Sequence, residues 1–218
     1  MWAVAEMAVP TKEELRQALE DRVGAELQEK LSDATVAVCG LGGLGSHIAI
    51  SLARAGVGHL ILIDFDAVDI TNLNRQQYKV TQIGQAKAEA LADNLREVNP
   101  YLDYQATAVR LTEENIPQLL RGADVICEAF DRADQKSLLV NCVLEQLPGT
   151  PLVAASGMAG LGDGNAIRTR KITRRFYLCG DGVSDVEDLG SLFAPRVMLC
   201  AAHQALTVLQ ILAGKEIM

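Results

Sequence analysis

The sequence predicts an α/β fold: a doubly wound, Rossmann-like and mainly parallel sheet with helices on both faces and an antiparallel hairpin extension near the C-terminus. Short apolar runs alternate with longer amphipathic segments, as strands and helices do in such a sheet. Four glycines, Gly40, Gly42, Gly43 and Gly45, stand between one apolar run and the helix expected after it. The chain is 49% hydrophobic but only 4% aromatic, which suits a core packed with aliphatic side chains.

The N-terminal segment is predicted to be helical. Thr11 is a candidate N-cap with Glu14 three residues later, which is the pattern of a capping box. Apolar residues then recur at every fourth position, so one continuous helix is expected over residues 11–32. Residues 1–10 are expected to be disordered. Residues 11–218 are expected to form a single domain, because no linker or internal repeat divides them.

A βαβ unit follows this helix. Residues 36–39 and 59–63 are apolar enough to be buried strands, and the helix between them is expected to end at Gly56. Asp64 stands directly after the second strand. The later elements are expected in this order: a helix over 84–99, a strand over 103–109, a short helix from Thr112 that holds Pro117, a strand over 124–129, a helix over 133–147 and a strand over 152–156.

The composition changes after the last of these strands. Residues 157–164 hold four glycines and are expected to form a mobile loop. Residues 166–172 and 175–179 predict an antiparallel hairpin. Residues 180–195 are acidic and irregular, and a last helix is expected over residues 196–214.

The charge balance weighs against nucleic acid as a partner. The chain has 20 Lys and Arg residues against 28 Asp and Glu residues and a formal net charge of −8, whereas a dedicated nucleic-acid-binding domain is usually basic. A local exception is the basic cluster of Arg168, Arg170, Lys171, Arg174 and Arg175. This cluster fits either a solvated sheet edge or a docking patch for an acidic partner protein.

The cysteines and the first residues predict a cytoplasmic protein. The five cysteines are scattered and mostly lie in apolar runs, which favours reduced thiols. The mildly apolar first residues lack the basic region of a secretory signal and are interrupted by Glu6 and Pro10. No apolar stretch approaches the length of a membrane span, so no membrane partner is expected.

The polar residues around the glycine turn predict a nucleotide site. Backbone N–H groups of a helix that opens on glycines can hold phosphate oxygens, and Asp64 can accept a hydrogen bond from a ribose hydroxyl. A dinucleotide site would need little more. This chain continues with Asn72, Arg75, Gln76 and Lys87, and added cationic donors are what a triphosphate requires.

Asp131 is the candidate metal ligand. It follows the strand expected over 124–129, so it should emerge at the same carboxyl edge of the sheet as the glycine turn, where open α/β sheets bind their ligands. A carboxylate at this edge can hold Mg²⁺, which bridges triphosphate oxygens. Asp134, at the start of the next expected helix, is a competing candidate, and Asp131 is preferred.

The glycine run GLGGLG, the segment LIDFD that ends at Asp66 and the run NLNRQ over residues 72–76 resemble the ATP-binding core of the ThiF/MoeB/HesA family, relatives of ubiquitin-activating enzymes. The resemblance continues through GQAK over residues 84–87 and through Asp131 to the final helix, and it covers roughly residues 16–214. Short members of this family are usually assigned to a second ThiF group in thiamine biosynthesis.

This resemblance implies ATP-dependent adenylation of the C-terminal glycine carboxylate of a ubiquitin-like, ThiS-like sulfur carrier protein. It further implies that Asn72, Arg75 and Lys87 hold the phosphates with Gln76 beside them, and that Asp131 binds Mg²⁺. The carrier is expected to dock on residues 157–195, with the glycine-rich loop guiding its extended tail.

The resemblance also implies a homodimer. In relatives, an arginine matched here by Arg16 reaches across the dimer to the ATP of the partner subunit. The Arg-Tyr pair that precedes this arginine in relatives is replaced by Glu13 and Glu14, and Arg22 is a substitute candidate.

Cysteine usage departs from the pattern of larger relatives. Those proteins carry two Cys-x-x-Cys pairs for a structural zinc, whereas this chain has no such pair, so no zinc is expected. Residues 180–195 contain no acceptor cysteine for a thioester or persulfide step. Cys179 beside this segment is a weak candidate, while Cys200 lies in an apolar run typical of a buried thiol.

Three alternatives stay open at this stage. One is adenylation of another substrate, as in relatives that serve molybdopterin, cysteine or tRNA modification. Another is an NAD-dependent oxidoreductase, which would share the glycine turn and Asp64 but leave residues 72–76 and Lys87 without a purpose. The third is a non-catalytic ATP-binding partner protein, which the absent acceptor cysteine makes conceivable.

Overall fold

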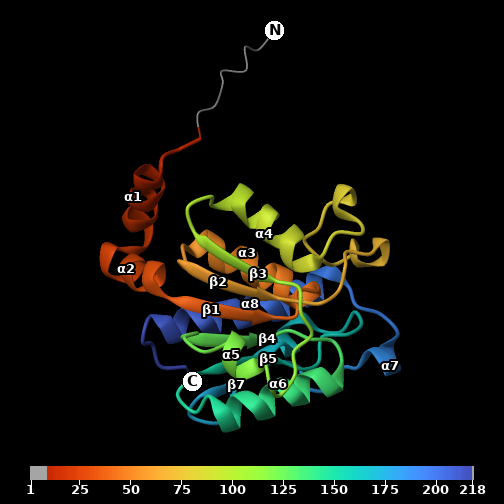
Figure 1. Ribbon diagram of the computed structural model, residues 1–218. Helices are drawn as coiled ribbons and strands as arrows, with labels where there is room; N and C mark the ends of the chain where they lie inside the picture. Colours follow the sequence, from red (N-terminus) through yellow and green to blue (C-terminus); the bar gives the residue numbers. More distant parts are fainter. Residues whose placement is uncertain (1–8, 218) are drawn as a thin grey trace.

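The computed structural model describes residues 9–217 and contains a seven-stranded sheet in the order β3-β2-β1-β4-β5-β7-β6 (Figure 1). Every neighbouring pair is parallel except β6 and β7, which are antiparallel. The predicted fold class is therefore confirmed, hairpin included. The strands are β1 (Thr35–Cys39), β2 (His59–Ile63), β3 (Asp103–Thr107), β4 (Val125–Glu128), β5 (Leu152–Ala155), β6 (Arg168–Lys171) and β7 (Phe176–Gly180).

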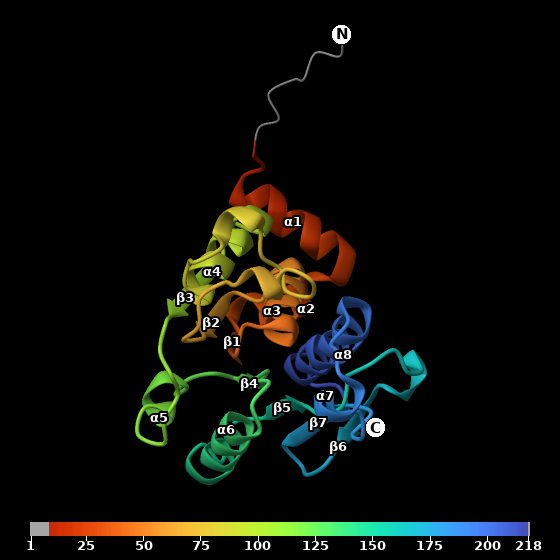
Figure 2. The same cartoon turned by 90° about the vertical axis from the view of Figure 1, so that its right-hand side faces the viewer.

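Helices cover both faces of the sheet (Figure 2). One face carries α3 (Gly43–Ala55), α4 (Lys87–Val98) and α8 (Ala194–Leu212), and the other carries α5 (Ile116–Leu119) and α6 (Ala133–Gln146). Three short 3-10 helices, η1 (Ile70–Asn72), η2 (Val80–Gln82) and η3 (Gly164–Ala166), lie in connecting segments. Among the helices of residues 9–217, none combines the length and the apolar character that crossing a membrane would require.

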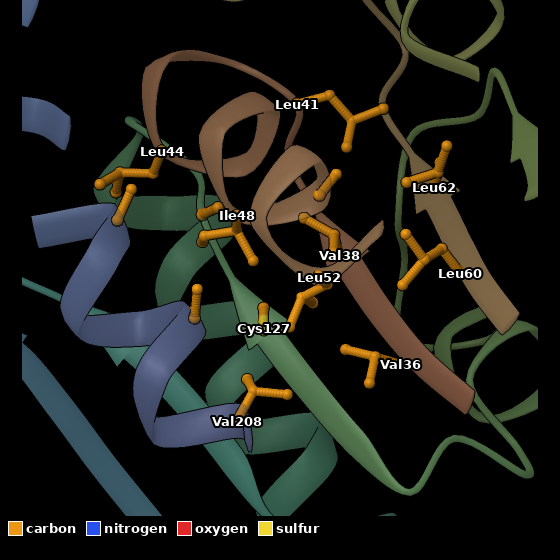
Figure 3. Packing of buried hydrophobic residues seen from close by; sticks show 14 of the residues in the cluster. Val36, Val38, Leu41, Leu44, Ile48, Leu52, Leu60, Leu62, Cys127 and Val208 are labelled. Carbon is orange, nitrogen blue, oxygen red and sulfur yellow. The ribbon is translucent and has the colours of Figure 1, made fainter. Parts of the chain in front are cut away.

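The core explains why β1 is apolar from Val36 to Cys39. Val36 and Val38 face α3 and α8, whereas Ala37 and Cys39 belong to the core on the opposite face. Figure 3 shows Ile48 and other side chains of α3 pointing at the β1 valines. Because both faces of a central parallel strand are covered, its sequence has no polar alternation. Each fully buried Val, Leu or Ile side chain contributes about 1.5–3 kcal/mol.

The N-terminal helix predicted over residues 11–32 is instead two helices, α1 (Lys12–Val23) and α2 (Ala25–Asp33). The predicted capping box at Thr11 is present. Gly24 separates the helices because its φ of 90° lies in a region that other residues rarely adopt. The prediction of disorder for residues 1–10 falls, for residues 1–8, outside the described residues.

Other element boundaries shift for local reasons. The helix expected from Gly84 begins at Lys87, because Gly84 has a φ of 87° and forms a turn. The helix expected from Thr112 begins at Ile116, after a turn in which Thr112 and Asn115 bond each other's backbone N–H groups. The segment expected to be irregular over 180–195 contains α7 (Val186–Leu189), which Asp185 caps.

Candidate functional site

A cavity of about 520 Å³ opens at the carboxyl ends of the central strands, a volume typical of small-ligand sites. We describe its wall in two parts. The glycine-loop half consists of Gly40, Gly42, Gly43, Asp64, Asp66, Arg75, Gln76 and Lys87. The cover half contains Asp131, Arg132, Gln135, Gly157, Met158, Ala159, Ser184, Asp185, Val186, Glu187, Leu192 and Val197.

The glycine turn is shaped by close backbone approaches. A Cβ on Gly40, whose φ is 88°, would lie 2.8 Å from the backbone of Ala129. The N-cap of α3 is Gly42, which offers no side chain, so the first N–H groups of the helix have no side-chain cap. Gly45 does not line the cavity: a Cβ there would lie 1.8 Å from the Gly40 carbonyl oxygen. Gly45 therefore allows α3 to pack against the turn, whereas Gly40, Gly42 and Gly43 line the cavity.

Asp64 is fixed at the end of β2 by two backbone hydrogen bonds. Its Oδ2 accepts from the N–H of Leu41 at 2.6 Å and its Oδ1 accepts from the N–H of Asp66 at 2.8 Å. The residue is only 6% exposed, and this burial raises the pKa of Asp64, although the hydrogen bond from Leu41 and the charge of Lys87 oppose the rise. Each oxygen keeps a further acceptor site for a ligand hydroxyl.

The cationic groups of the glycine-loop half come from two different segments. Lys87 is the first residue of α4, and its side chain is 8% exposed with Nζ 3.2 Å from Oδ2 of Asp66. Arg75 follows η1, where its Nη1 donates to Oδ1 of Asn74 at 2.9 Å. The two side chains line the same cavity beside the uncapped start of α3, so this half carries positive charge suited to phosphates.

Gln76 lines the cavity while Asn72 does not. Gln76 is buried, and its Oε1 has no hydrogen-bond partner within residues 9–217. Its amide nitrogen faces Gly42, 3.6 Å from where a Cβ would stand. Asn72 lies outside the cavity and closes η1, since its Oδ1 accepts from the N–H of Asp69 at 3.1 Å. The structure thus brings Gln76 to the glycine loop and gives Asn72 a role in the adjoining turn.

The two candidate metal ligands occupy different places. Asp131 is exposed and lines the cavity, whereas Asp134 lies outside it and pairs with Arg132 at 2.9 Å. Within the described part of the chain, no three His, Cys, Asp or Glu side chains are grouped to hold a metal ion. A magnesium ion held by Asp131 would therefore take most of its ligands from phosphate oxygens and water, as is usual for this ion.

Arg16 is not brought to this cavity. It lies on α1 and pairs with Glu13 and Glu20 of the same helix, the second at 2.5 Å. Spacings of three and four residues place such side chains next to one another on a helix surface. Arg22 also lies on the exposed surface of α1 and outside the cavity lining. Within one chain, neither arginine reaches the glycine-loop half.

The cysteines are all buried. Burial raises the pKa of the Cys179 thiol, and it raises that of Cys200 to about 12. Since the thiolate is the nucleophile, both thiols are poorly suited to attack in this conformation. Neither residue lines the cavity.

The basic cluster divides into anchored and exposed members. Arg175 donates to the carbonyl oxygens of Leu144, Leu147 and Thr150, which end α6 and the turn after it. Arg170 donates to the carbonyl oxygen of Gly180 at 2.9 Å. Arg175 and Arg170 therefore make hydrogen bonds within the fold, although Arg170 is itself exposed, while Arg168, Lys171 and Arg174 are exposed on the edge strand β6 and its turn.

Several cavity residues carried no signal in the sequence. Gln135, in the first turn of α6, is only 7% exposed, and its Oε1 has no hydrogen-bond partner among the described residues. Ser184, Asp185 and Glu187 reach the cavity from the acidic segment after β7. Only composition marked that segment, and composition does not say which way a loop turns. Asp66, the partner of Lys87, could have been found from its position directly after β2.

The chain matches the ThiF family over residues 15–218. It is 33% identical over 207 residues to the sulfur carrier protein ThiS adenylyltransferase of Escherichia coli (strain K12), covering 92% of this chain and 81% of that relative. It is 35% identical over 155 residues to the tRNA threonylcarbamoyladenosine dehydratase of Bacillus subtilis (strain 168), covering 70% and 60%. Four of the matches are to longer curated proteins, and the chain spans only 29% to 60% of their length.

The fold is similar to the crystal structure of the E. coli tRNA N6-threonylcarbamoyladenosine dehydratase in complex with ATP, with a TM-score of 0.83 and 23% sequence identity. That likeness covers 95% of this chain and 98% of the other. At this identity it supports the fold alone, while the sequence match extends over nearly the whole chain. The chain therefore belongs to the ThiF family.

Proposed function

We propose that this protein adenylates the C-terminal glycine carboxylate of a ubiquitin-like sulfur carrier protein with ATP. The observation that carries the proposal is the unequal lining of the cavity: a glycine turn with Arg75 and Lys87 on one side, and the uncharged residues 157–159 beside acidic side chains on the other. The relative from E. coli that matches most of this chain is named a sulfur carrier protein adenylyltransferase, which supports the same substrate class.

The reaction needs positioning and charge neutralisation more than covalent chemistry. A carboxylate oxygen of the carrier attacks the α-phosphorus, the bond from this phosphorus to the bridging oxygen breaks, and pyrophosphate leaves with the electron pair. Arg75 and Lys87 are the groups that would offset the charge of the leaving phosphates. Asp64 would orient the ribose through its free acceptor sites. No cysteine takes part in this step.

Magnesium is proposed as the accompanying ion, with Asp131 as its ligand from the protein. When bound, Mg²⁺ supplies positive charge that bridges phosphate oxygens. The exposed carboxylate of Asp131 fits this role because it lines the cavity and forms none of the ion pairs found in the described chain. Asp66 fits less well, since its carboxylate already contacts Lys87.

A tRNA substrate is the second candidate, favoured by the 35% identity to the B. subtilis tRNA dehydratase. The charge of the cover half weighs against it. Three acidic side chains, those of Asp131, Asp185 and Glu187, line that side of the cavity against one cation, Arg132, and the chain as a whole has a formal net charge of −8. A polyanionic RNA would be repelled from such an entrance far more strongly than the Gly-Gly tail of a carrier protein, whose only charge is its single terminal carboxylate.

The setting of the reaction is proposed as follows. The carrier would serve thiamine biosynthesis, in the cytoplasm, and the enzyme would act as a homodimer. Arg16 would reach ATP only from the partner subunit and only after leaving Glu13 and Glu20. Exposed ion pairs of this kind hold a side chain only weakly because solvent screens the charges, so little opposes such a rearrangement.

The test is exchange of labelled pyrophosphate into ATP in the presence of Mg²⁺. Three arms are compared: protein alone, protein with a ThiS-like carrier ending in Gly-Gly, and protein with tRNA that carries threonylcarbamoyladenosine, the nucleoside in the name of the B. subtilis relative. Exchange that depends on the carrier, and that disappears when the terminal glycine is removed, supports the proposal. Exchange stimulated by tRNA instead would replace the carrier with the second candidate.

Binding measurements separate the remaining alternatives. A protein that binds ATP but exchanges no pyrophosphate with any substrate would be a non-catalytic ATP-binding partner. A protein that binds NAD and not ATP would be an oxidoreductase that shares only the glycine turn and Asp64. Either result would contradict the adenylation proposal.

A further inference from the structure

Two separate segments of the chain contribute to the cover half of the cavity wall: residues 157–163 and residues 181–187. We call these two segments together the cover. They are joined by backbone hydrogen bonds, from the N–H of Asp181 to the carbonyl oxygen of Gly157 at 2.9 Å and from the N–H of Gly182 to that of Ser156 at 3.0 Å. Gly157, with a φ of 82°, allows this approach, since a Cβ there would stand 2.0 Å from Oδ1 of Asp181. The two segments therefore move together or not at all.

One side chain binds both segments to the rest of the protein. Arg196, in the first turn of α8, donates from Nη2 to Oδ2 of Asp181 at 2.6 Å and from Nη1 to the carbonyl oxygen of Asp163 at 2.9 Å. Its guanidinium lies flat against Gly162, where a Cβ would come within 3.4 Å of Nη1. One planar cation thus holds the end of one cover segment and the beginning of the other.

This pair is unlike the other ion pairs of the described chain. Both side chains of the Arg196–Asp181 pair are 7% exposed, whereas in the remaining pairs at least one partner is 16% exposed or more. Hydrogen bonds from the backbone N–H groups of Val183 and Ser184 to Oδ1 complete the surroundings of Asp181. A buried pair with satisfied oxygens is weak evidence for stability but is well suited to fix one arrangement of the groups it joins.

The segments that the Arg196–Asp181 pair holds in place supply residues to the wall of the cavity. Ser184, Asp185, Val186 and Glu187 directly follow the Asp181 turn and line the cavity, and so do Gly157, Met158 and Ala159 in the other segment. Val197, the neighbour of Arg196 on α8, lies under the glycine turn, with its Cγ1 2.9 Å from where a Cβ on Gly43 would stand. The first turn of α8 therefore contacts both halves of the site.

We propose that Arg196 is a positioning residue that holds the cover over the acyl-substrate side of the cavity, so that the tail of the carrier meets a preformed channel. This inference rests on the proposed adenylation of a carrier protein. Arg196 touches neither the glycine loop nor the groups assigned to the phosphates, so it acts on the carrier and leaves the binding of ATP alone. The order it imposes is local to the cover.

The test compares Arg196→Gln, Arg196→Lys and Asp181→Asn with the wild type. Three quantities are measured: the Kd for ATP, the kcat and KM for the carrier in pyrophosphate exchange, and the rate of cleavage after the exposed Glu187 by a glutamate-specific endoproteinase. The matched control is Arg96→Gln, which removes an exposed pair with Asp93 of the same 2.6 Å length on α4.

For Arg196→Gln, we expect the KM for the carrier to rise about tenfold to a hundredfold. A small displacement of the groups that position a substrate typically has an effect of this size. Cleavage after Glu187 should accelerate by a similar factor, while the Kd for ATP stays within about twofold. Arg196→Lys should recover part of the loss, since an ammonium can reach Asp181 but cannot hold the Asp163 carbonyl oxygen as well. Arg96→Gln should behave as the wild type.

Two results would overturn the proposal: a folded Arg196→Gln protein with unchanged KM and unchanged cleavage, or one whose ATP affinity falls as much as its carrier affinity. If Arg196→Gln does not fold, Asp181→Asn gives the same readouts, because it preserves the shape of the turn and removes only the charge. If the wild type shows no carrier-dependent exchange, the proposed function fails. The cleavage rates with and without ATP then still decide whether Arg196 holds the cover.

Discussion

The two halves of the cavity are held in place by different means. In the glycine-loop half, the backbone itself sets the shape: Gly40 packs against Ala129, and Asp64 is fixed by the N–H groups of Leu41 and Asp66. In the cover half, two loops are joined to each other by backbone hydrogen bonds and tied to α8 by the buried ion pair between Arg196 and Asp181. Both halves follow strands of the sheet: the glycine turn follows β1, Asp64 follows β2, and the two cover segments follow β5 and β7. The cover segments differ in being tied to α8 by the Arg196 side chain.

This difference separates affinity for the nucleotide from affinity for the second substrate. A change in the glycine-loop half should alter how phosphates and ribose are held, whereas a change in the cover should alter what approaches them. It also separates two kinds of contact. Residues 40–45 and Asp64 are brought together by the parallel pairing of β1 and β2, which the pattern of apolar strands predicts. Arg196 and Asp181 lie only 15 residues apart in the chain, but they meet through a side-chain contact that no sequence pattern marks.

Loss of the Arg75 guanidinium should give the largest effect, because it should abolish most of the activity of the glycine-loop half without unfolding the protein. Arg75→Ala is expected to lower kcat/KM for pyrophosphate exchange about 10²–10³-fold, because it removes a charge that offsets the leaving phosphates. The melting temperature should change little, since among residues 9–217 the side chain donates hydrogen bonds only to its neighbours Thr71 and Asn74. Lys79→Ala, which removes an exposed pair with Glu97, is the control and should retain activity. Wild-type activity in Arg75→Ala would refute the assignment.

Replacement of Asp64 should weaken ATP binding by about tenfold to a hundredfold, measured by calorimetry. Each carboxylate oxygen accepts from a different backbone N–H, so Asp64→Asn leaves one donor facing an amide NH₂ group, at a cost of about 1–3 kcal/mol. Asp66→Asn is the matched comparison. Its carboxylate is exposed, so it should change affinity by less than about threefold. Equal losses in the two variants would show that the buried bonds of Asp64 do not matter.

A substitution at Gly45 tests the packing role of a glycine that does not line the cavity. Gly45→Ala is expected to lower the free energy of unfolding by about 1–3 kcal/mol, because its Cβ would meet the Gly40 carbonyl oxygen at 1.8 Å. Gly149→Ala, with nothing within 4 Å, should be neutral or slightly stabilising. Urea denaturation of both variants gives the comparison. A stable Gly45→Ala protein would mean that the turn can move to make room.

The smallest effect concerns acid stability of the cover half. Burial by itself raises the pKa of Asp181, but the N–H groups of Ser184 and Val183 and the Arg196 pair outweigh it and lower the pKa to about 2 from the ordinary 3.8. A carboxyl whose pKa is depressed by folding stabilises the fold above its unfolded value and loses that contribution as pH falls through the folded value. The stability difference between wild type and Asp181→Asn should therefore be constant above about pH 4 and shrink towards pH 2. A difference that persists at pH 2 would exclude the charge as its source.

Particular residues show how far the sequence could be interpreted. The alternation of strands and helices gave the sheet and its hairpin, and Arg75, Gln76, Lys87 and Asp131 indeed line one cavity. Their predicted roles in phosphate and metal binding stay predictions. The prediction of one continuous N-terminal helix was wrong. The spacing of apolar residues continues across Gly24, but the helical backbone conformation is interrupted there.

Other residues could be placed only in three dimensions. Asn72 and Gly45 belong to the same sequence runs as residues that line the cavity, but neither lines it. Asn72 bonds within the 3-10 turn of η1, and Gly45 packs against the Gly40 carbonyl oxygen at the start of α3. Gln135 is an ordinary helix residue in the sequence, and only its burial beside the cavity distinguishes it. A run of letters gives the spacing along the chain but not the direction of each side chain.

By itself, the sequence determined the succession of the strands and of the main helices between them, the glycine turn with its acidic partner Asp64, and membership in the ThiF family. These depend on local periodicity and on spacing within one βαβ unit, which neighbouring residues encode. The tertiary structure alone decided that the cover closes one side of the cavity and that Arg196 and Asp181 hold it there. A buried ion pair gains its strength from the low-dielectric surroundings that many distant residues create together, so no local pattern predicts it.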